Sequence, residues 1–154
     1  MSLASGEPET AFVGGSVDPA SRPSCMIVED QILIALALEA SLEDLGIAVG
    51  RPISSASEAL EWLDAHTPSV AILDYALKDG PCTTLIRRLA ERRIPFVIYS
   101  GHNRSVAPRK LQNVPWLTKP CDWEVLLAAL TRAAPALAAW KGSRDGGEDL
   151  PLRR

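Results

Sequence analysis

The chain has 154 residues, of which 47% are hydrophobic and 23% are charged, and its formal net charge is −3. This length leaves room for one domain with a hydrophobic core. The slight negative charge argues against binding to nucleic acid or to an anionic membrane surface, both of which favour basic proteins. No apolar stretch approaches the roughly 18 residues of a membrane span, and the N-terminus lacks the basic start and apolar run of a signal peptide. We therefore expect a protein without a nucleic-acid or membrane partner.

The cysteine pattern indicates the compartment. The three cysteines are an odd number without a C-x-x-C pair: Cys25, Cys82 and Cys121. This pattern argues against a disulfide framework or a zinc site and favours a reducing, cytoplasmic location. Four arginines lie close together in the sequence, and we interpret them as the solvated face of a helix: Arg87, Arg88, Arg92 and Arg93.

Apolar runs and helical periodicity alternate along the middle of the chain. Short apolar runs predict strands at 25–28, 47–49, 70–74, 95–100 and 116–118. Apolar residues that recur at helical spacing predict helices at 31–45, 55–66 and 83–93, and from Asp122 to about residue 137. The stretches 78–81 and 101–113 are less regular, and Pro108 interrupts any helix in the second of them.

Several residues mark the expected ends of these helices. Gly46 is a typical stop after the first helix. Ser55 and Glu58 have the capping-box spacing at the start of the second helix. Asp122 is expected to cap the last helix, and Pro135 is expected to kink or end it.

The alternation of strands and helices indicates the fold class. Such a pattern is typical of βαβ units and a parallel sheet. The continuously apolar strands agree, because helices cover both faces of a parallel sheet. We therefore predict an α/β fold with a doubly wound five-stranded parallel sheet at 24–140. Residues 1–23 and 141–154, which lack sustained periodicity, are predicted to be flexible tails.

Polar residues stand at the ends of four of the predicted strands. Glu29 and Asp30 follow the first strand, and Asp74 ends the third. Ser100 ends the fourth strand, and Lys119 follows the fifth. The carboxyl ends of parallel strands share one edge of the sheet, and sites in such folds form at that edge. We therefore expect these five residues to converge.

Three converging carboxylates need a compensating cation. Two unit negative charges about 5 Å apart repel by roughly 3 kcal/mol at an effective dielectric near 20. Mg²⁺ is a suitable ion because it takes one or two carboxylates together with phosphate oxygens, and Lys119 adds a further positive charge. A carboxylate beside Mg²⁺ can attack phosphorus and form an aspartyl phosphate. The hydroxyl of Ser100 could then hydrogen-bond a phosphoryl oxygen.

Over about residues 24–138 the chain resembles the receiver domain of two-component response regulators. The resemblance is carried by the acidic pair Glu29-Asp30, Asp74 after an apolar strand, Ser100-Gly101 and Lys119-Pro120. It implies a flavodoxin-like (βα)5 receiver fold and Mg²⁺-dependent phosphoryl transfer from a histidine kinase or phosphotransfer protein to Asp74. It also implies a phosphoprotein that switches its interaction with an unknown downstream protein, or that relays or drains phosphate.

The resemblance implies a metal site and a catalytic activity limited to the chain itself. Asp30 and Asp74 would bind Mg²⁺ directly, and Glu29 would bind it through water. The backbone carbonyl of Ala76 would be a further ligand. Such a domain catalyses only its own phosphorylation and dephosphorylation, and we do not expect an enzyme with external substrates.

The resemblance also implies a switch, with one departure from the usual pattern. Ser100 matches the switch hydroxyl, Trp116 the switch aromatic residue and Lys119 the phosphate-binding lysine. The stretch after Ser100 is shorter and less regular than usual, which resembles a subgroup with Ser/Thr-Gly after the fourth strand and a reduced fourth helix. No output domain follows in the sequence, so we expect a stand-alone receiver.

Two other classes of function stay open. A phosphatase of the haloacid dehalogenase type needs a second carboxylate two residues past its nucleophile, and this chain has Ala76 there, which argues against it. A pseudo-receiver, which binds proteins without being phosphorylated, would be expected to lose Asp30, Asp74 or Lys119, and all three are present. Structural roles also stay open for the acidic pair as a helix cap and for Trp116 as core packing.

Overall fold

The computed structural model describes residues 22–140, so residues 1–21 and 141–154 of the expected tails lie outside the described residues. One five-stranded parallel sheet has the order β2-β1-β3-β6-β7. Its strands are β1 (Ser24–Val28), β2 (Ala48–Val49), β3 (Val70–Leu73), β6 (Phe96–Ser100) and β7 (Trp116–Thr118). The chain extends the sheet to one side of β1 and then to the other, as a doubly wound fold does. The predicted fold class is confirmed.

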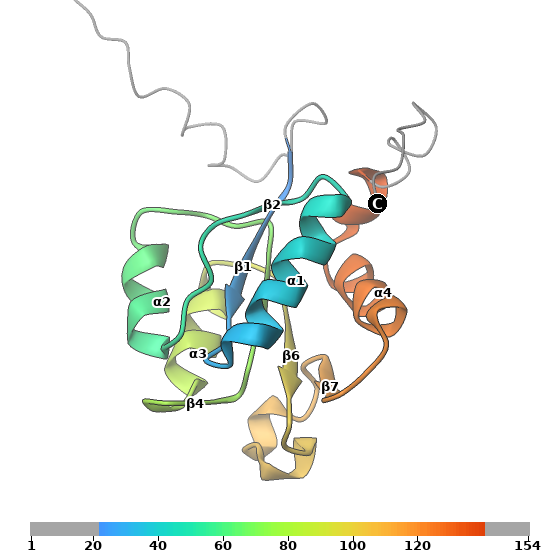
Figure 1. Cartoon of the computed structure of the whole chain (residues 1–154). Coiled ribbons are helices and arrows are strands. Elements are labelled where there is room, and N and C mark those ends of the chain that lie inside the picture. The colour runs from blue at the N-terminus through green and yellow to red at the C-terminus, as the bar shows by residue number, and fades with distance from the viewer. Residues whose placement is uncertain (1–21, 141–154) are drawn as a thin grey trace, which may run out of the picture.

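Helices cover both faces of this sheet (Figure 1). One face carries α1 (Ile32–Asp44) and α4 (Trp123–Ala133). The other face carries α2 (Ala56–Leu63) and α3 (Thr83–Glu91). The strands supply both layers, because successive strand residues point to opposite sides. In β1, for example, Met26 and Val28 pack against α2 and α3, whereas Ile27 packs against α1 and α4.

The helix ends follow the sequence signals in most cases. The hydroxyl oxygen of Ser55 accepts a hydrogen bond from the backbone N–H of Glu58 at 3.1 Å, as the capping-box spacing predicts. Gly46 follows α1 with a φ of 85°, which favours glycine. Asp122 occupies the N-cap position of α4, but its side chain makes no capping hydrogen bond. The helix α4 ends two residues before Pro135.

Both ends of the described chain are hydrogen-bonded to the turn between α1 and β2. The guanidinium of Arg22 donates to the carbonyl of Gly46 at 3.0 Å. At the other end, the indole N–H of Trp140 donates to the carbonyl of Leu45 at 3.1 Å. Contacts with the domain therefore continue through residues 22 and 140.

Two connections at the carboxyl edge of the sheet position the site (Figure 1). The stretch 78–81, predicted to be irregular, is part of an antiparallel hairpin of β4 (Ala76–Leu77) and β5 (Gly80–Pro81). The stretch 101–113 lacks an α-helix, as predicted. Within it lie two short 3-10 helices, η2 (Arg104–Val106) and η3 (Arg109–Leu111).

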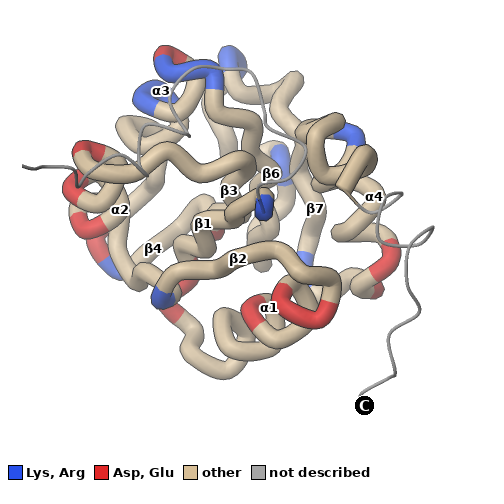
Figure 2. The backbone as a smooth tube through the Cα atoms, turned by 90° about the horizontal axis from the view of Figure 1, so that it is seen from above, with Lys and Arg blue, Asp and Glu red and all other residues tan. Residues whose placement is uncertain are grey.

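The clustered arginines lie along α3 and its end, where Figure 2 shows Lys and Arg gathered on the outside of the molecule. Two of them join α3 to α2. Arg88 lies 3.5 Å from a carboxylate oxygen of Asp64, and Arg92 donates to the carbonyl of Leu63 at 2.6 Å. Within residues 22–140, no helix has the length and hydropathy that a membrane span requires.

The cysteines pack as small hydrophobic residues. Cys25 and Cys82 are buried and Cys121 is half-buried, and all three thiols are free. Burial raises the pKa of the Cys25 and Cys82 thiols to about 12. Both thiols are therefore protonated at neutral pH and are poor nucleophiles.

Candidate functional site

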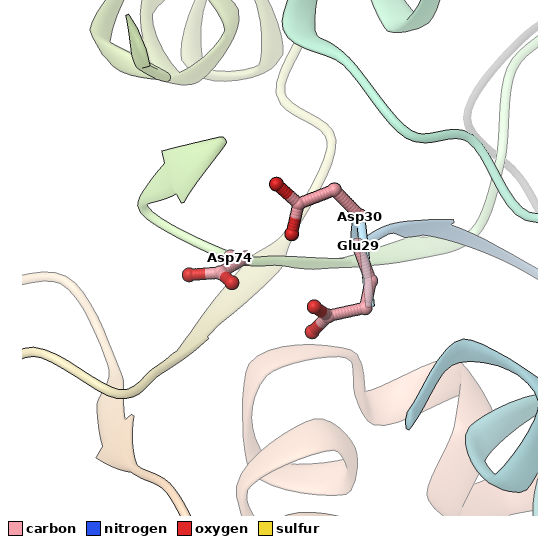
Figure 3. Close-up of side chains that lie close together, drawn as sticks. All are labelled: Glu29, Asp30 and Asp74. Carbon is pink, nitrogen blue, oxygen red and sulfur yellow. The ribbon is translucent and has the colours of Figure 1, made fainter. Parts of the chain in front are cut away.

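Three carboxylates meet at the carboxyl edge of the sheet. Glu29 and Asp30 follow β1, and Asp74 follows β3 (Figure 3). One oxygen from each residue lies within 4.8 Å of the others. Glu29 is 4% exposed and Asp74 is 7% exposed. The structure therefore brings together the three carboxylates that the sequence predicts at this edge.

The ammonium of Lys119 lies between two of these carboxylates. Its Nζ atom is 2.8 Å from Oε1 of Glu29 and 3.1 Å from Oδ2 of Asp74. Its backbone N–H donates to the carbonyl of Ser100 at 2.7 Å, which continues the pairing of β6 with β7. Because both carboxylates are buried, solvent weakens these ion pairs less than it would at the surface.

Burial and the ion pairs have opposite effects on the ionisable groups. Burial raises the pKa of the Glu29 carboxyl, although the hydrogen bond from Lys119 opposes this shift. Burial alone lowers the pKa of Lys119, but its hydrogen bonds to Glu29 and Asp74 and their negative charge outweigh this effect and hold the pKa above its ordinary value. Lys119 is therefore a cation at neutral pH, and it balances only part of the charge that three carboxylates can carry.

The donor set fits a hard divalent cation. Mg²⁺ takes oxygen ligands and is commonly bound by one or two carboxylates, and the edge offers three carboxylate groups at suitable separation. Ala76 is the first residue of the hairpin and follows Asp74 by two positions. Its N–H donates to Oδ1 of Asp74 at 3.3 Å. Ala76, whose carbonyl the resemblance implies as a further metal ligand, is thus hydrogen-bonded to the carboxylate of Asp74.

Ser100 reaches the same edge as the last residue of β6. Its side chain is fully buried, at 0% exposure. Its hydroxyl oxygen accepts a hydrogen bond from the backbone N–H of His102 at 3.1 Å. The hydroxyl is therefore bonded to the connection that follows β6, and a rotation about its side-chain bond would change that contact.

Trp116 packs in the core and is also bonded to that connection. It is 8% exposed, and its ring centroid lies 5.3 Å from that of Tyr75. Its indole N–H donates to the backbone carbonyl of His102 at 2.9 Å. Trp116 thus packs in the core, its switch role stays a prediction, and the backbone of one residue, His102, joins Ser100 to Trp116.

Sequence reasoning missed two neighbours of the site. Gln31 is the N-cap residue of α1, and its side-chain oxygen lies 3.5 Å from Nζ of Lys119. Its backbone N–H donates to Oε2 of Glu29 at 3.1 Å. Tyr75, directly after Asp74, is 7% exposed. The only signal for Gln31 and Tyr75 was that each directly follows a predicted site residue, Asp30 or Asp74. An apolar strand pattern does not show where the side chain after the strand points.

Comparison with known proteins gives a consistent result. A family model described as the response regulator receiver domain matches residues 25–131. A solved structure described as a sensor protein from Polaromonas sp. JS666 is 30% identical with a TM-score of 0.67, and the match covers 76% of this chain and 99% of that one. The search of curated proteins gives no match.

Two further solved structures are similar. SdrG from Pseudomonas melonis Fr1, solved in its BeF3-activated conformation, is 32% identical with a TM-score of 0.60, over 71% of this chain and 97% of that one. A CheY-like response regulator receiver domain from Methylobacillus flagellatus is 24% identical with a TM-score of 0.59, over 71% of this chain and 99% of that one, and shares the fold. Since the family model covers nearly all of the sheet and its helices and every residue of the carboxylate cluster, this chain belongs to the response regulator receiver domain family.

Proposed function

We propose that this chain is a phosphorylation switch in which Asp74 accepts a phosphoryl group from a histidine kinase or a phosphotransfer protein. The observation that carries the proposal is the position of Lys119, whose ammonium contacts Asp74 at 3.1 Å and Glu29 at 2.8 Å beside a third carboxylate. Membership of the receiver family supports it, because this family consists of phospho-acceptor signalling domains. The proposal includes a cytoplasmic location, which the free thiols support.

In the proposed reaction, a carboxylate oxygen of Asp74 attacks the phosphorus atom of the phosphohistidine. The P–N bond breaks, its electron pair stays on the imidazole nitrogen, and the new P–O bond makes Asp74 an aspartyl phosphate. Mg²⁺ bound by Glu29, Asp30, Asp74 and the carbonyl of Ala76 would supply positive charge to the phosphoryl oxygens. Lys119 would bind one of these oxygens from the position that it already occupies beside Asp74.

The proposed signal passes from Ser100 into the 101–115 segment, which is the whole connection between β6 and β7. To donate to a phosphoryl oxygen, the Ser100 hydroxyl must turn toward Asp74, and this turn strains its bond from the N–H of His102. The carbonyl of His102 in turn holds Trp116. Because two bonds through one residue connect the site to the segment, phosphorylation should alter the surface of the segment, which we assign to the downstream partner.

The start of α1 offers a surface for the phosphodonor. Gln31 contacts Lys119 in the site, and three exposed apolar residues follow it on α1: Ile32 at 65%, Leu33 at 78% and Leu36 at 48% exposure. Exposed apolar residues that lie together commonly mark a protein interface. A donor protein must bring its phosphohistidine to Asp74 at this edge, so we assign the apolar start of α1 to that donor.

Phosphorylation by a small donor tests the proposal directly. Incubation with acetyl phosphate and Mg²⁺ should add one phosphoryl group, and peptide mass spectrometry should find it on Asp74. Hydroxylamine should remove the label, because an acyl phosphate is labile whereas a phosphoserine at Ser100 is not. Asp74→Asn should abolish labelling. Asp64→Asn changes an exposed aspartate on the outside of the domain and should be labelled like the wild-type protein.

The contrary result is equally clear. A folded wild-type protein that takes no label from acetyl phosphate with Mg²⁺, or from any phosphorylated histidine kinase offered to it, would contradict the switch. The chain would then be a pseudo-receiver, which binds its partners without phosphorylation.

A further inference from the structure

The turn of the β4–β5 hairpin is attached to the start of α2 through Asp79. Its Oδ1 atom accepts a hydrogen bond from the N–H of Ala56 at 3.0 Å, and its Oδ2 atom accepts one from the N–H of Ser57 at 3.1 Å. These are the first two N–H groups of α2, which have no acceptor within the helix. One carboxylate thus joins two segments that lie 22 and 23 residues apart in the sequence.

The base of the same hairpin is attached to the phospho-acceptor. The N–H of Ala76 donates to Oδ1 of Asp74 at 3.3 Å, and the N–H of Cys82 donates to the carbonyl of Tyr75 at 3.0 Å. Each strand of the hairpin has two residues. Because so short a ladder is not stable alone, the conformation of the hairpin depends on its attachments at the base and at the turn.

The helix α2 is a fixed body to which the turn is tied. Ala59 and Leu63 are buried at 0% and 1% exposure. At its far end, Arg92 donates to the carbonyl of Leu63 and to the hydroxyl of Thr67, both at 2.6 Å. A carboxylate at the start and a guanidinium at the end both suit the helix dipole. The position of Asp79 is therefore set by an element outside the site.

We infer that Asp79 is a positioning residue for phosphoryl transfer, because it ties the hairpin turn to α2 and so holds Ala76 in place at Asp74. This inference rests on the proposed function, in which the carbonyl of Ala76 is a Mg²⁺ ligand. Asp79 acts through the hairpin and contacts none of the reacting atoms. Substitution of Asp79 should therefore make Ala76 more mobile, although every proposed Mg²⁺ ligand is still present.

A matched set of variants separates positioning from simple helix capping. Asp79→Ala removes both bonds, and Asp79→Asn keeps one acceptor oxygen. Ser55→Ala is the control, because Ser55 caps the same helix through the N–H of Glu58 without a bond to the hairpin. All three variants should lower the melting temperature, since each weakens the start of α2.

Amide hydrogen exchange gives the first readout and needs no metal. Asp79→Ala should speed the exchange of Ala76 and Cys82 roughly tenfold, because local opening becomes easier. Ser55→Ala should leave both rates unchanged. If the exchange of Ala76 and Cys82 is unchanged in Asp79→Ala, or rises as much in Ser55→Ala, the inference is wrong whatever the metal does.

Titration calorimetry with Mg²⁺ gives the second readout. The dissociation constant should rise several-fold in Asp79→Ala, rise less in Asp79→Asn and stay at the wild-type value in Ser55→Ala. Equal losses in the alanine and asparagine variants would assign the effect to the charge of Asp79 and overturn the inference. A wild-type protein that binds no Mg²⁺ would overturn the proposed metal site and this inference together, whereas unchanged amide exchange would overturn this inference alone.

Discussion

The two connections at the carboxyl edge, the hairpin 76–81 and the 101–115 segment, are held in opposite ways. The hairpin is bonded to other parts of the domain: the carboxylate of Asp79 accepts from the first N–H groups of α2, and the backbone N–H of Ala76 donates to the carboxylate of Asp74. The turn and the base of the hairpin are thus both fixed to other elements, the start of α2 and the residue that follows β3.

The 101–115 segment is bonded mainly to itself. The guanidinium of Arg104 donates to the carbonyls of Gln112 and Val114, the second at 2.8 Å. The side-chain amide of Gln112 donates to the carbonyl of Ala107 at 3.0 Å. A connection that is bonded internally can move as one unit about its ends, whereas one bonded to its neighbours cannot. The difference is consistent with the proposed function, in which the hairpin would hold the proposed metal site and the segment would carry the response to phosphorylation.

The largest expected effect separates the two connections directly. Beryllofluoride with Mg²⁺ mimics the phosphoryl group and should change hydrogen exchange in residues 100–118 by more than about tenfold. The amides at the turn of the hairpin should change much less, because Asp79 anchors this turn to α2, outside the site. Asp74→Asn with the same reagents is the control and should show no change. If exchange changes at the hairpin turn but not in residues 100–118, the segment is the fixed connection and the comparison is wrong.

A smaller effect should follow from loosening the segment. Arg104→Ala removes a charged donor from two carbonyls and should lower the free energy of unfolding by about 1–2 kcal/mol. Arg109→Ala removes an exposed arginine from the same segment and should leave stability nearly unchanged. Thermal unfolding of both variants measures the difference. Labelling of Asp74 by acetyl phosphate should persist in both, and equal melting temperatures would show that the segment is not held by Arg104.

The smallest effect concerns the hairpin anchor. The hydrogen bonds from Ala56 and Ser57 hold the pKa of Asp79 below its ordinary value. A lowered folded-state pKa contributes stability that is present above the unfolded-state pKa of about 4 and is lost as the pH falls through the folded-state value. The wild-type protein should therefore melt slightly above Asp79→Asn at pH 7, and the gap should close on acidification. A difference in melting temperature that does not change with pH would show that the ionisation of Asp79 is not its cause.

The parts of the molecule that the sequence predicted are those with a strong local pattern. Each strand of the sheet contains an apolar run, and a polar residue follows four of those runs. Both the sheet and the meeting of Glu29, Asp30, Asp74 and Lys119 were therefore predictable. These residues meet because the carboxyl ends of parallel strands lie at one edge of the sheet.

The parts that the sequence did not predict depend on distant partners. The hairpin has strands of two residues, too short for any periodicity, and Pro81 argues against a strand. The Asp-Gly pair at Asp79 signals a turn, but nothing local shows that its carboxylate binds a helix formed more than twenty residues earlier. The contact of Gln31 with Lys119 spans 88 residues, and a local pattern cannot show it.

The link between Ser100 and Trp116 has a consequence for evolution. Both of its hydrogen bonds use backbone atoms of His102, an N–H and a carbonyl, while the imidazole itself is exposed. Any amino acid except proline supplies those two atoms. Natural selection can therefore preserve the link while the side chain at position 102 drifts freely, so that relatives with unrelated residues there can retain the same coupling.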